Sequence, residues 1–169
     1  MKLQEIPLGT VVNAHGIRGE VKVNPLPAFD PAEIAGFKQL LIGGKLTPVS
    51  AARMHKSTVL LKLPGVEDMD AALALKGKSV AVRREDAHLP EGECFEAELV
   101  GCTVVDDATG ETLGLLHRVL HYPAHAVYEV KGEREYLIPA VPGVFIAGVD
   151  VEAGTVRVHM MKGLATDEN

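Results

Sequence analysis

Short apolar runs rich in β-branched residues recur along this 169-residue chain, and polar connections containing glycine or proline separate them. The first two runs, residues 8–14 and 20–23, flank a polar segment, His15-Gly16-Ile17-Arg18-Gly19, which we call the elbow. Two such runs around a connection with two glycines predict paired strands and a tight turn. The histidine and arginine of the elbow interrupt the apolar pattern, so we expect their side chains to face solvent or a partner.

The same pattern continues through the first half of the chain. Residues 25–31 are proline-rich and cannot form a central strand. The next runs, residues 40–42 and 46–52, predict a hairpin around Gly43-Gly44. A turn at residues 53–56 and two further strands, at 57–63 and 79–84, are expected after it. Short strands at regular spacing indicate a small closed barrel. Residues 66–78 differ, because Asp68 or Asp70 can cap a short structural helix that Lys76 and Gly77 end.

The second half repeats the β pattern after a polar, aperiodic stretch. We expect strands at residues 99–105, 111–120, 126–130, 135–138, 149–151 and 155–159, and a frayed tail beyond them. The prediction is an all-β protein of two small β-barrel domains, the first with one short α-helix, joined by a short linker. The boundaries are 1–85, a linker at 86–92, and 93–169 with the tail frayed from about 162.

Composition and charge indicate the type of core, the cellular location and the binding partners that we expect. Aromatic residues are only 4% and tryptophan is absent, so the core must be aliphatic. No apolar run is long enough for a membrane helix or a signal peptide, and we expect a soluble cytoplasmic protein. The net charge is −6, divided as +2 over residues 1–92 and −8 over residues 93–169. An acidic surface can simply aid solubility, but this asymmetry also suits RNA beside the first half and a basic protein beside the second.

The residue types that form metal and catalytic sites in other proteins do not form a recognisable site in this sequence. Cys94 and Cys102 are eight apart, a spacing that favours two reduced, packed thiols over a metal or disulfide site. His117, His121 and His125 would share a helix face, but Pro123 breaks such a helix. No nucleotide-binding loop or nucleophile motif occurs. We therefore expect no enzyme, no catalytic residues, no metal, no cofactor and no small-molecule substrate.

Two surfaces remain as candidates for binding. At the elbow, the two glycines allow a backbone to approach closely, while the side chains of Arg18 and His15 can contact phosphate or an acidic surface. The predicted contact set for RNA or a partner particle is His15, Gly16, Arg18, Gly19 and Lys22. The competing interpretation is an ordinary solvated turn. Other cations would extend the surface if the fold gathers them, namely Arg53, Lys56, Arg83 and Arg84.

The second candidate follows the linker, at Cys94, Phe95, Glu96 and Glu98. Phe95 among carboxylates is either an exposed aromatic anchor for a protein partner or a side chain packed between the domains. A third segment, residues 138–142, contains two prolines, and packing is its expected role.

In sequence order, residues 14–23 (AHGIRGEVKV), 66–86, 110–120 and 133–160 resemble the ribosome maturation factor RimM family over nearly the whole chain. The resemblance implies an N-terminal RimM barrel and a C-terminal PRC-type barrel. It also implies a monomeric, non-enzymatic assembly chaperone for the head of the small (30S) subunit, which aids 16S rRNA processing and binds ribosomal protein nineteen. That family usually has paired tyrosines where this chain has Cys94, Phe95 and Glu96, so one aromatic stands in place of two or three.

Two alternatives from other classes stay open at this point. A small barrel can hold a flavin or another cofactor as an enzyme, which an absorbance scan of the purified protein would detect. A PRC-type barrel can also serve as an electron-transfer accessory, although the chain has no apolar segment to anchor it to a membrane.

Overall fold

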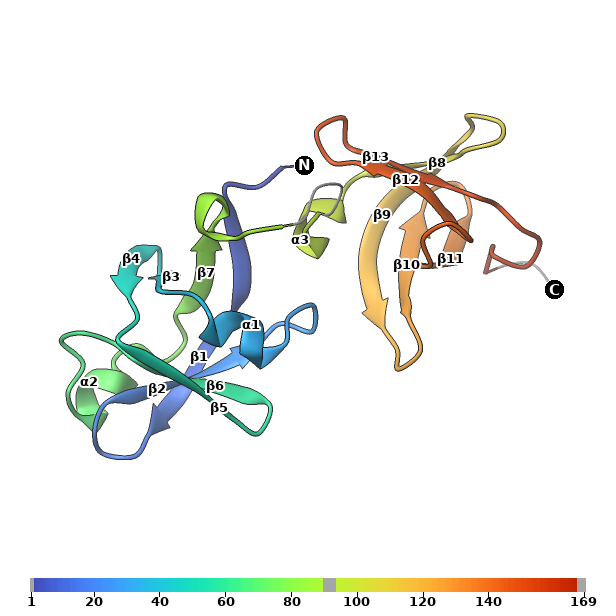
Figure 1. Ribbon diagram of the computed structural model, residues 1–169. Helices are drawn as coiled ribbons and strands as arrows, with labels where there is room; N and C mark the ends of the chain where they lie inside the picture. The colour runs from blue at the N-terminus through green and yellow to red at the C-terminus, as the bar shows by residue number, and fades with distance from the viewer. Residues whose placement is uncertain (1, 90–93, 167–169) are drawn as a thin grey trace. The chain divides into compact units, whose positions relative to one another are not determined.

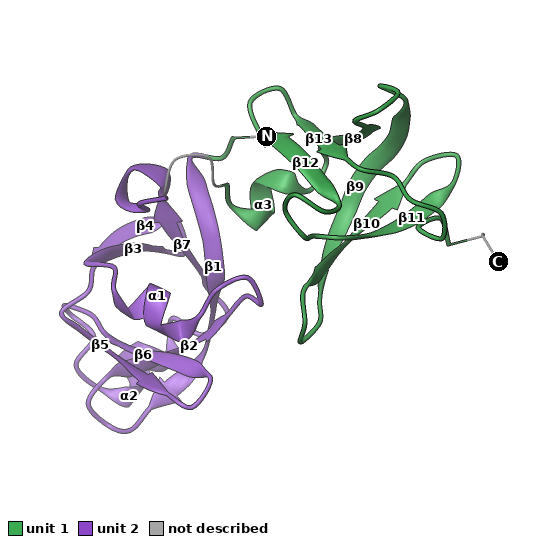
Figure 2. Ribbon diagram, turned by 45° about the vertical axis from the view of Figure 1, so that its right-hand side comes forward, with its two compact units in different colours: residues 1–3, 91–169 green, residues 4–90 purple. Residues whose placement is uncertain are grey.

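The computed structural model describes residues 2–89 and 94–166 of the chain. It divides into two compact units, which we call the first unit (residues 4–90) and the second unit (residues 1–3 with 91–169) (Figure 2). Strands predominate in both units, and the predicted all-β class with two small β-domains is confirmed (Figure 1). None of the helices in the described residues is long and apolar enough to span a bilayer.

The first unit is one antiparallel sheet of seven strands in the order β4-β3-β7-β1-β2-β6-β5. The strands are β1 (Glu5–His15), β2 (Glu20–Pro25), β3 (Gln39–Ile42), β4 (Lys45–Pro48), β5 (Ala51–His55), β6 (Thr58–Lys62) and β7 (Ser79–Arg83). The long β1 lies at the centre and pairs with both β2 and β7. The predicted pairing across the elbow and the two-glycine turn between β3 and β4 are confirmed.

Alternation along these strands creates an aliphatic core, as the scarcity of aromatic residues requires. In β1 the side chains of Ile6, Leu8 and Val11 are at most 1% exposed, and Val21 and Val23 of β2 are fully buried. Strands β6 and β7 contribute further branched side chains that are 1% exposed or less, namely Val59, Leu60, Leu61, Val80 and Val82.

Two short α-helices lie among the described residues of the first unit, where we predicted one. Helix α2 (Met69–Leu73) is the predicted helix, and Asp68 caps it by accepting a hydrogen bond from the Ala71 amide at 2.8 Å. Helix α1 (Pro31–Ala35) was not predicted, although Asp30 caps it and Pro31 begins it, a usual start signal. The helix is only five residues long, so its apolar periodicity is too short to detect.

The predicted turn at residues 53–56 is wrong. Arg53, Met54 and His55 belong to β5, and the turn to β6 consists of Lys56 and Ser57, with Lys56 in the left-handed region at φ 58°. The apolar run at 46–52 is divided between two strands. Its first part, in β4, pairs with β3 as far as Pro48, and its second part, in β5, pairs with β6 from Ala51 onwards.

After β7 the chain enters a short 3₁₀ helix, η1 (Arg84–Asp86). Asp86 accepts hydrogen bonds from Arg83 at 2.9 Å and Gln39 at 3.0 Å. The first residue of the predicted linker is therefore held by the first unit, and residues 90–92 of that linker lie outside the described residues.

The second unit is a six-stranded sheet in the order β11-β10-β9-β8-β13-β12. The strands are β8 (Thr103–Asp106), β9 (Thr112–His121), β10 (Ala126–Lys131), β11 (Glu135–Pro139), β12 (Ile146–Asp150) and β13 (Thr155–Val158). All neighbours are antiparallel except β8 and β13, which run parallel. Its core consists mainly of aliphatic side chains with one cysteine, including Cys102, Val104, Leu116, Val130, Ile138, Val156 and Val158.

Two expectations for the second half are wrong. The predicted strand at 99–105 begins only at Thr103, since Leu99 ends a helix, α3 (Glu96–Leu99). The tail is not frayed over residues 162–166: Leu164 and Thr166 exchange backbone hydrogen bonds with β11, and Ala165 is 3% exposed. A strand pairing this short leaves little periodic signal in the sequence.

Candidate functional site

The elbow is the connection between β1 and β2, closed by the last pair of the ladder, His15 and Glu20. Gly16 and Gly19 both have positive φ, at 68° and 89°. Ile17 is 76% exposed and Arg18 is also exposed, so the tip of the elbow presents side chains to solvent as the sequence predicted.

A single ammonium group holds the elbow in place. Lys62 Nζ at the end of β6 donates to the carbonyl oxygens of Arg18 at 2.6 Å and of Val66 at 2.5 Å, and lies 3.3 Å from a carboxylate oxygen of Glu67. Charge-assisted hydrogen bonds of this kind are the stronger class. Lys62 therefore fixes the elbow backbone against the segment of residues 63–66.

Gly19 is required by the same close approach. A Cβ atom at this position would collide with the carbonyl group of Val66, and the positive φ disfavours any other residue as well. A Cβ at Gly16 would meet no atom within 4 Å, so only its backbone conformation favours glycine there. The two glycines of the elbow thus have different roles.

The β5–β6 turn brings a second histidine to the elbow. The ring centroids of His15 and His55 are 4.9 Å apart, with the ring planes tilted by 53°. Partial burial is the largest cause that lowers the pKa of His55 below its ordinary value, and the neighbouring charges lower it further, namely those of His15, Lys56, Lys22 and Arg53. Sequence analysis missed His55, because only the register of β2, β6 and β5 places it beside His15.

The predicted extension of the surface is met only in part. Arg53 reaches the elbow but makes a two-pronged contact with Glu20, at 2.9 and 3.1 Å. This hydrogen bond is the main reason why the pKa of Glu20 is lowered. Arg83 is opposite Glu5, at the far end of β1 from the elbow, and binds Asp86 instead.

The cations that remain define the chemistry of the elbow. Arg18, Lys22 and Lys56 form no ion pair within residues 2–89 and 94–166. An open depression of about 330 Å³ lies beside them, lined by His15, Gly16, Ile17, Arg18, Glu20 and Arg53. Lone cations around a rigid turn suit an oxyanion such as a phosphate. We call Arg18, Lys22, Lys56, His15 and His55 the elbow surface.

The predicted protein-binding segment of the second unit is largely internal. Glu98 is fully buried in α3, where its two carboxylate oxygens accept from the amides of Leu3 at 2.8 Å and Phe95 at 3.2 Å. Phe95 is 9% exposed, so of the two alternatives for this side chain the exposed anchor is wrong. Cys94 and Glu96 are partly exposed, and Glu96 contacts His121 at 2.9 Å.

The three evenly spaced histidines have three different partners. His121 faces Glu96, His117 Nε2 lies 4.0 Å from Glu129, and His125 Nδ1 contacts the Ala126 carbonyl. Within the described residues, no group of three ligand side chains is placed to hold a metal. Burial raises the pKa of Glu129, but the hydrogen bond and charge of Arg118, with the charges of Lys131 and His117, together lower it below its ordinary value.

Two family models match the chain in succession. The model of the RimM N-terminal domain matches residues 6–87, and that of the RimM PRC barrel domain matches residues 96–164. The ribosome maturation factor RimM of Clostridium novyi is 36% identical over 159 residues, which cover 92% of this chain and 93% of that protein. The RimM of Staphylococcus epidermidis is 34% identical over 167 residues, covering 95% and 98%.

Solved structures of similar proteins carry the same family name. A RimM crystal structure from Pseudomonas aeruginosa is 27% identical, covers 93% of this chain and 98% of its own, and gives a TM-score of 0.45. The solution structure of the RimM N-terminal domain from Thermus thermophilus is 18% identical, covers 54% of this chain and all of its own, and gives a TM-score of 0.43.

The first prediction separates the two glycines of the elbow. Gly19→Ala should destabilise the first unit by about 3 kcal/mol, because the added Cβ is strained and also collides with the Val66 backbone. Gly16→Ala is the matched control and should cost only about 1 kcal/mol, from the backbone conformation alone. Native-state amide hydrogen exchange of β1 and β2 measures both values, and equal losses would contradict the close-approach role of Gly19.

The second prediction concerns the buried carboxylate. Glu98→Gln should destabilise the second unit by about 1–3 kcal/mol, because an amide NH₂ group then faces one of the two backbone N–H donors. Glu96→Gln alters the neighbouring, partly exposed carboxylate and should cost less than about 0.5 kcal/mol. All three tyrosines belong to the second unit, so urea unfolding followed by tyrosine fluorescence reports on it. A Glu98→Gln protein as stable as the control would rule out this capping role.

Proposed function

This chain belongs to the RimM family of ribosome maturation factors, and from that premise we propose that it is a non-catalytic assembly factor for the head of the small ribosomal subunit. In this function the elbow surface contacts 16S rRNA of the immature subunit, and the acidic second unit binds ribosomal protein nineteen. Binding to the incompletely assembled head would favour its correct arrangement, and contacts formed at maturity would then displace the factor.

One observation supports the RNA contact above the others. In an acidic protein, Arg18, Lys22 and Lys56 lie without acidic partners in the described residues, around a turn that Lys62 holds rigid. Phosphate contacts from arginine and lysine position a protein on nucleic acid without reading its sequence. A preorganised turn loses little conformational entropy when it binds, which favours the association.

The charge of the second unit supports a basic protein partner. Its described cations are largely engaged, since Arg118 and Lys131 contact Glu129, Arg157 contacts Asp107 and Lys2 contacts Glu152. Exposed carboxylates that form no ion pair in the described residues remain, namely Glu111, Glu133, Glu135 and Asp150. Such a surface attracts a positively charged protein and raises its rate of association. In the predicted segment, the partly exposed Glu96 is the acidic residue that we retain as a contact.

Family membership favours this function over a flavin-binding barrel or an electron-transfer accessory. The direct test is a pull-down with the tagged full chain at low salt from lysates with and without small subunits. Immature small subunits should be enriched from the first lysate, and ribosomal protein nineteen, purified on its own, should bind the chain directly. Recovery of mature subunits alone, or of no subunit, would overturn the proposal.

Arg18→Ala tests the elbow surface. We expect association with immature small subunits to weaken about tenfold, the effect of losing one charge-assisted contact of roughly 1.4 kcal/mol, with an unchanged melting temperature. Lys38→Ala, an exposed cation of the same unit outside the elbow surface, should leave binding unaltered. A melting temperature lowered by several degrees with intact binding would return Arg18 to a structural role.

The pH dependence of RNA binding tests the histidine pair. The pKa of His55 is lowered in the free protein, whereas a nearby phosphate favours the protonated ring, so binding takes up a proton. The association constant for a 16S rRNA head-domain fragment should therefore rise as the pH falls from 7.5 towards 6. His55→Gln should flatten this dependence while the salt dependence persists. An unchanged pH profile in His55→Gln would exclude the histidine from the contact.

A further inference from the structure

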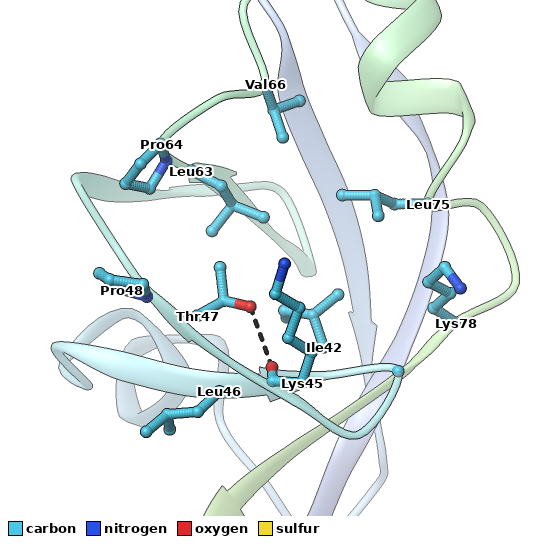
Figure 3. A pocket seen from close by; sticks show the side chains of 11 residues that line it. Ile42, Lys45, Leu46, Thr47, Pro48, Leu63, Pro64, Val66, Leu75 and Lys78 are labelled. Atoms are coloured by element: carbon cyan, nitrogen blue, oxygen red, sulfur yellow. Dashed lines mark hydrogen bonds between the residues drawn. The ribbon is translucent and has the colours of Figure 1, made fainter.

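A second cleft lies in the first unit, outside the elbow surface. It has a volume of about 320 Å³ and lies between strand β4 and the segment of residues 63–66 (Figure 3). Aliphatic side chains form its walls. Ile42 comes from the end of β3, Leu63 and Val66 from the segment after β6, and Leu75 from the segment after α2. Figure 3 shows Leu63, Val66 and Leu75 pointing towards the same space. The cleft is therefore shaped for an apolar side chain.

Strand β4 forms one border of this cleft, and it is an edge strand. Among the described strands it pairs only with β3, through a hairpin closed by Gly43 and Gly44. In such a hairpin Ile42 and Lys45 exchange both hydrogen bonds, so the ladder alternation directs the N–H and C=O of Leu46 outwards. An exposed edge of this kind can pair with an extended peptide.

Two lysines flank the apolar space. Lys45 and Lys78 form no ion pair in the part of the chain that the structure describes. The Lys45 side chain rises from β4 into the space near Leu63, whereas that of Leu46 points away (Figure 3). The aliphatic stem of Lys78 packs against the hairpin turn, since a Cβ at Gly43 would lie 3.0 Å from its Cδ atom. Both lysines are exposed and form no ion pair in the described residues, so their ammonium groups are available to a carboxylate.

We propose that this cleft binds an extended segment of a partner protein in which an apolar residue lies next to an acidic one. The apolar side chain fills the space between Leu63 and Leu75, the carboxylate meets Lys45 and Lys78, and the peptide backbone pairs with Leu46. None of the lining residues is aromatic, which disfavours stacking of a nucleic-acid base. The inference is independent of the function proposed for the elbow surface, because no residue of the cleft belongs to that surface.

The experiment begins with a phage-displayed library of random dodecapeptides panned against the immobilised full chain. The enriched peptides, made synthetically, should share an apolar residue beside Asp or Glu. In NMR titrations they should shift the backbone amide signals of Leu46, Val66 and Leu75. A Lys45→Glu, Lys78→Glu double variant should weaken their binding at least tenfold, whereas Lys38→Glu, a charge reversal outside the cleft, should not.

A charge swap keeps the test independent of folding. Peptides with Lys in place of the acidic residue should regain affinity for the double variant, which requires that the variant is folded. Enriched peptides without the shared pattern, equal losses in the Lys38→Glu control, or shifts confined to other residues would overturn the proposal. So would a short RNA oligonucleotide that produces the same shifts, since it would assign the cleft to nucleic acid.

Discussion

The position of the elbow in the first unit depends on the contacts of one ammonium group, that of Lys62. It joins two backbone segments that no strand pairing connects, the elbow at Arg18 and the chain at Val66. Peptide carbonyl groups that face each other without a donor would repel, and the ammonium supplies the donors for both. The absence of a side chain at Gly19 allows the segments to come this close. The same contact therefore fixes the elbow surface on one side and one wall of the aliphatic cleft on the other.

A feature could be predicted from the sequence when the residues that form it lie close together along the chain. The elbow, the Gly43-Gly44 turn and the Asp68 cap depend on residues within a few positions of one another, and all three are confirmed. The division of the apolar run at 46–52 depends on which strand each part pairs with. His55 lies beside His15 only because β5 and β6 extend the sheet from β2, forty residues later in the chain.

Glu98 illustrates the limit most clearly. Its position three residues after Phe95 is the spacing of half a capping box, a local signal that could have predicted α3. Its burial could not be predicted, because the second donor is the amide of Leu3, 95 positions away. A carboxylate in an acidic segment looks like a surface group until that long-range donor is known. The same burial leaves Glu96 as the partly exposed carboxylate of α3, which narrows the predicted protein contact to fewer atoms.

The charge asymmetry is compatible with RNA binding because the two electrostatic effects act over different distances. Exposed charges are screened beyond about 8–10 Å at physiological salt, so carboxylates farther than this from the elbow surface repel a bound phosphate only weakly. Contacts from Arg18, Lys22 and Lys56 act within hydrogen-bond distance, where screening is small. Attraction of a basic protein by the second unit acts before contact and falls steeply with salt. Added salt should therefore lower the association rate of the protein partner much more than it raises the dissociation rate, which distinguishes steering by the acidic surface from the short-range contacts that hold a complex together.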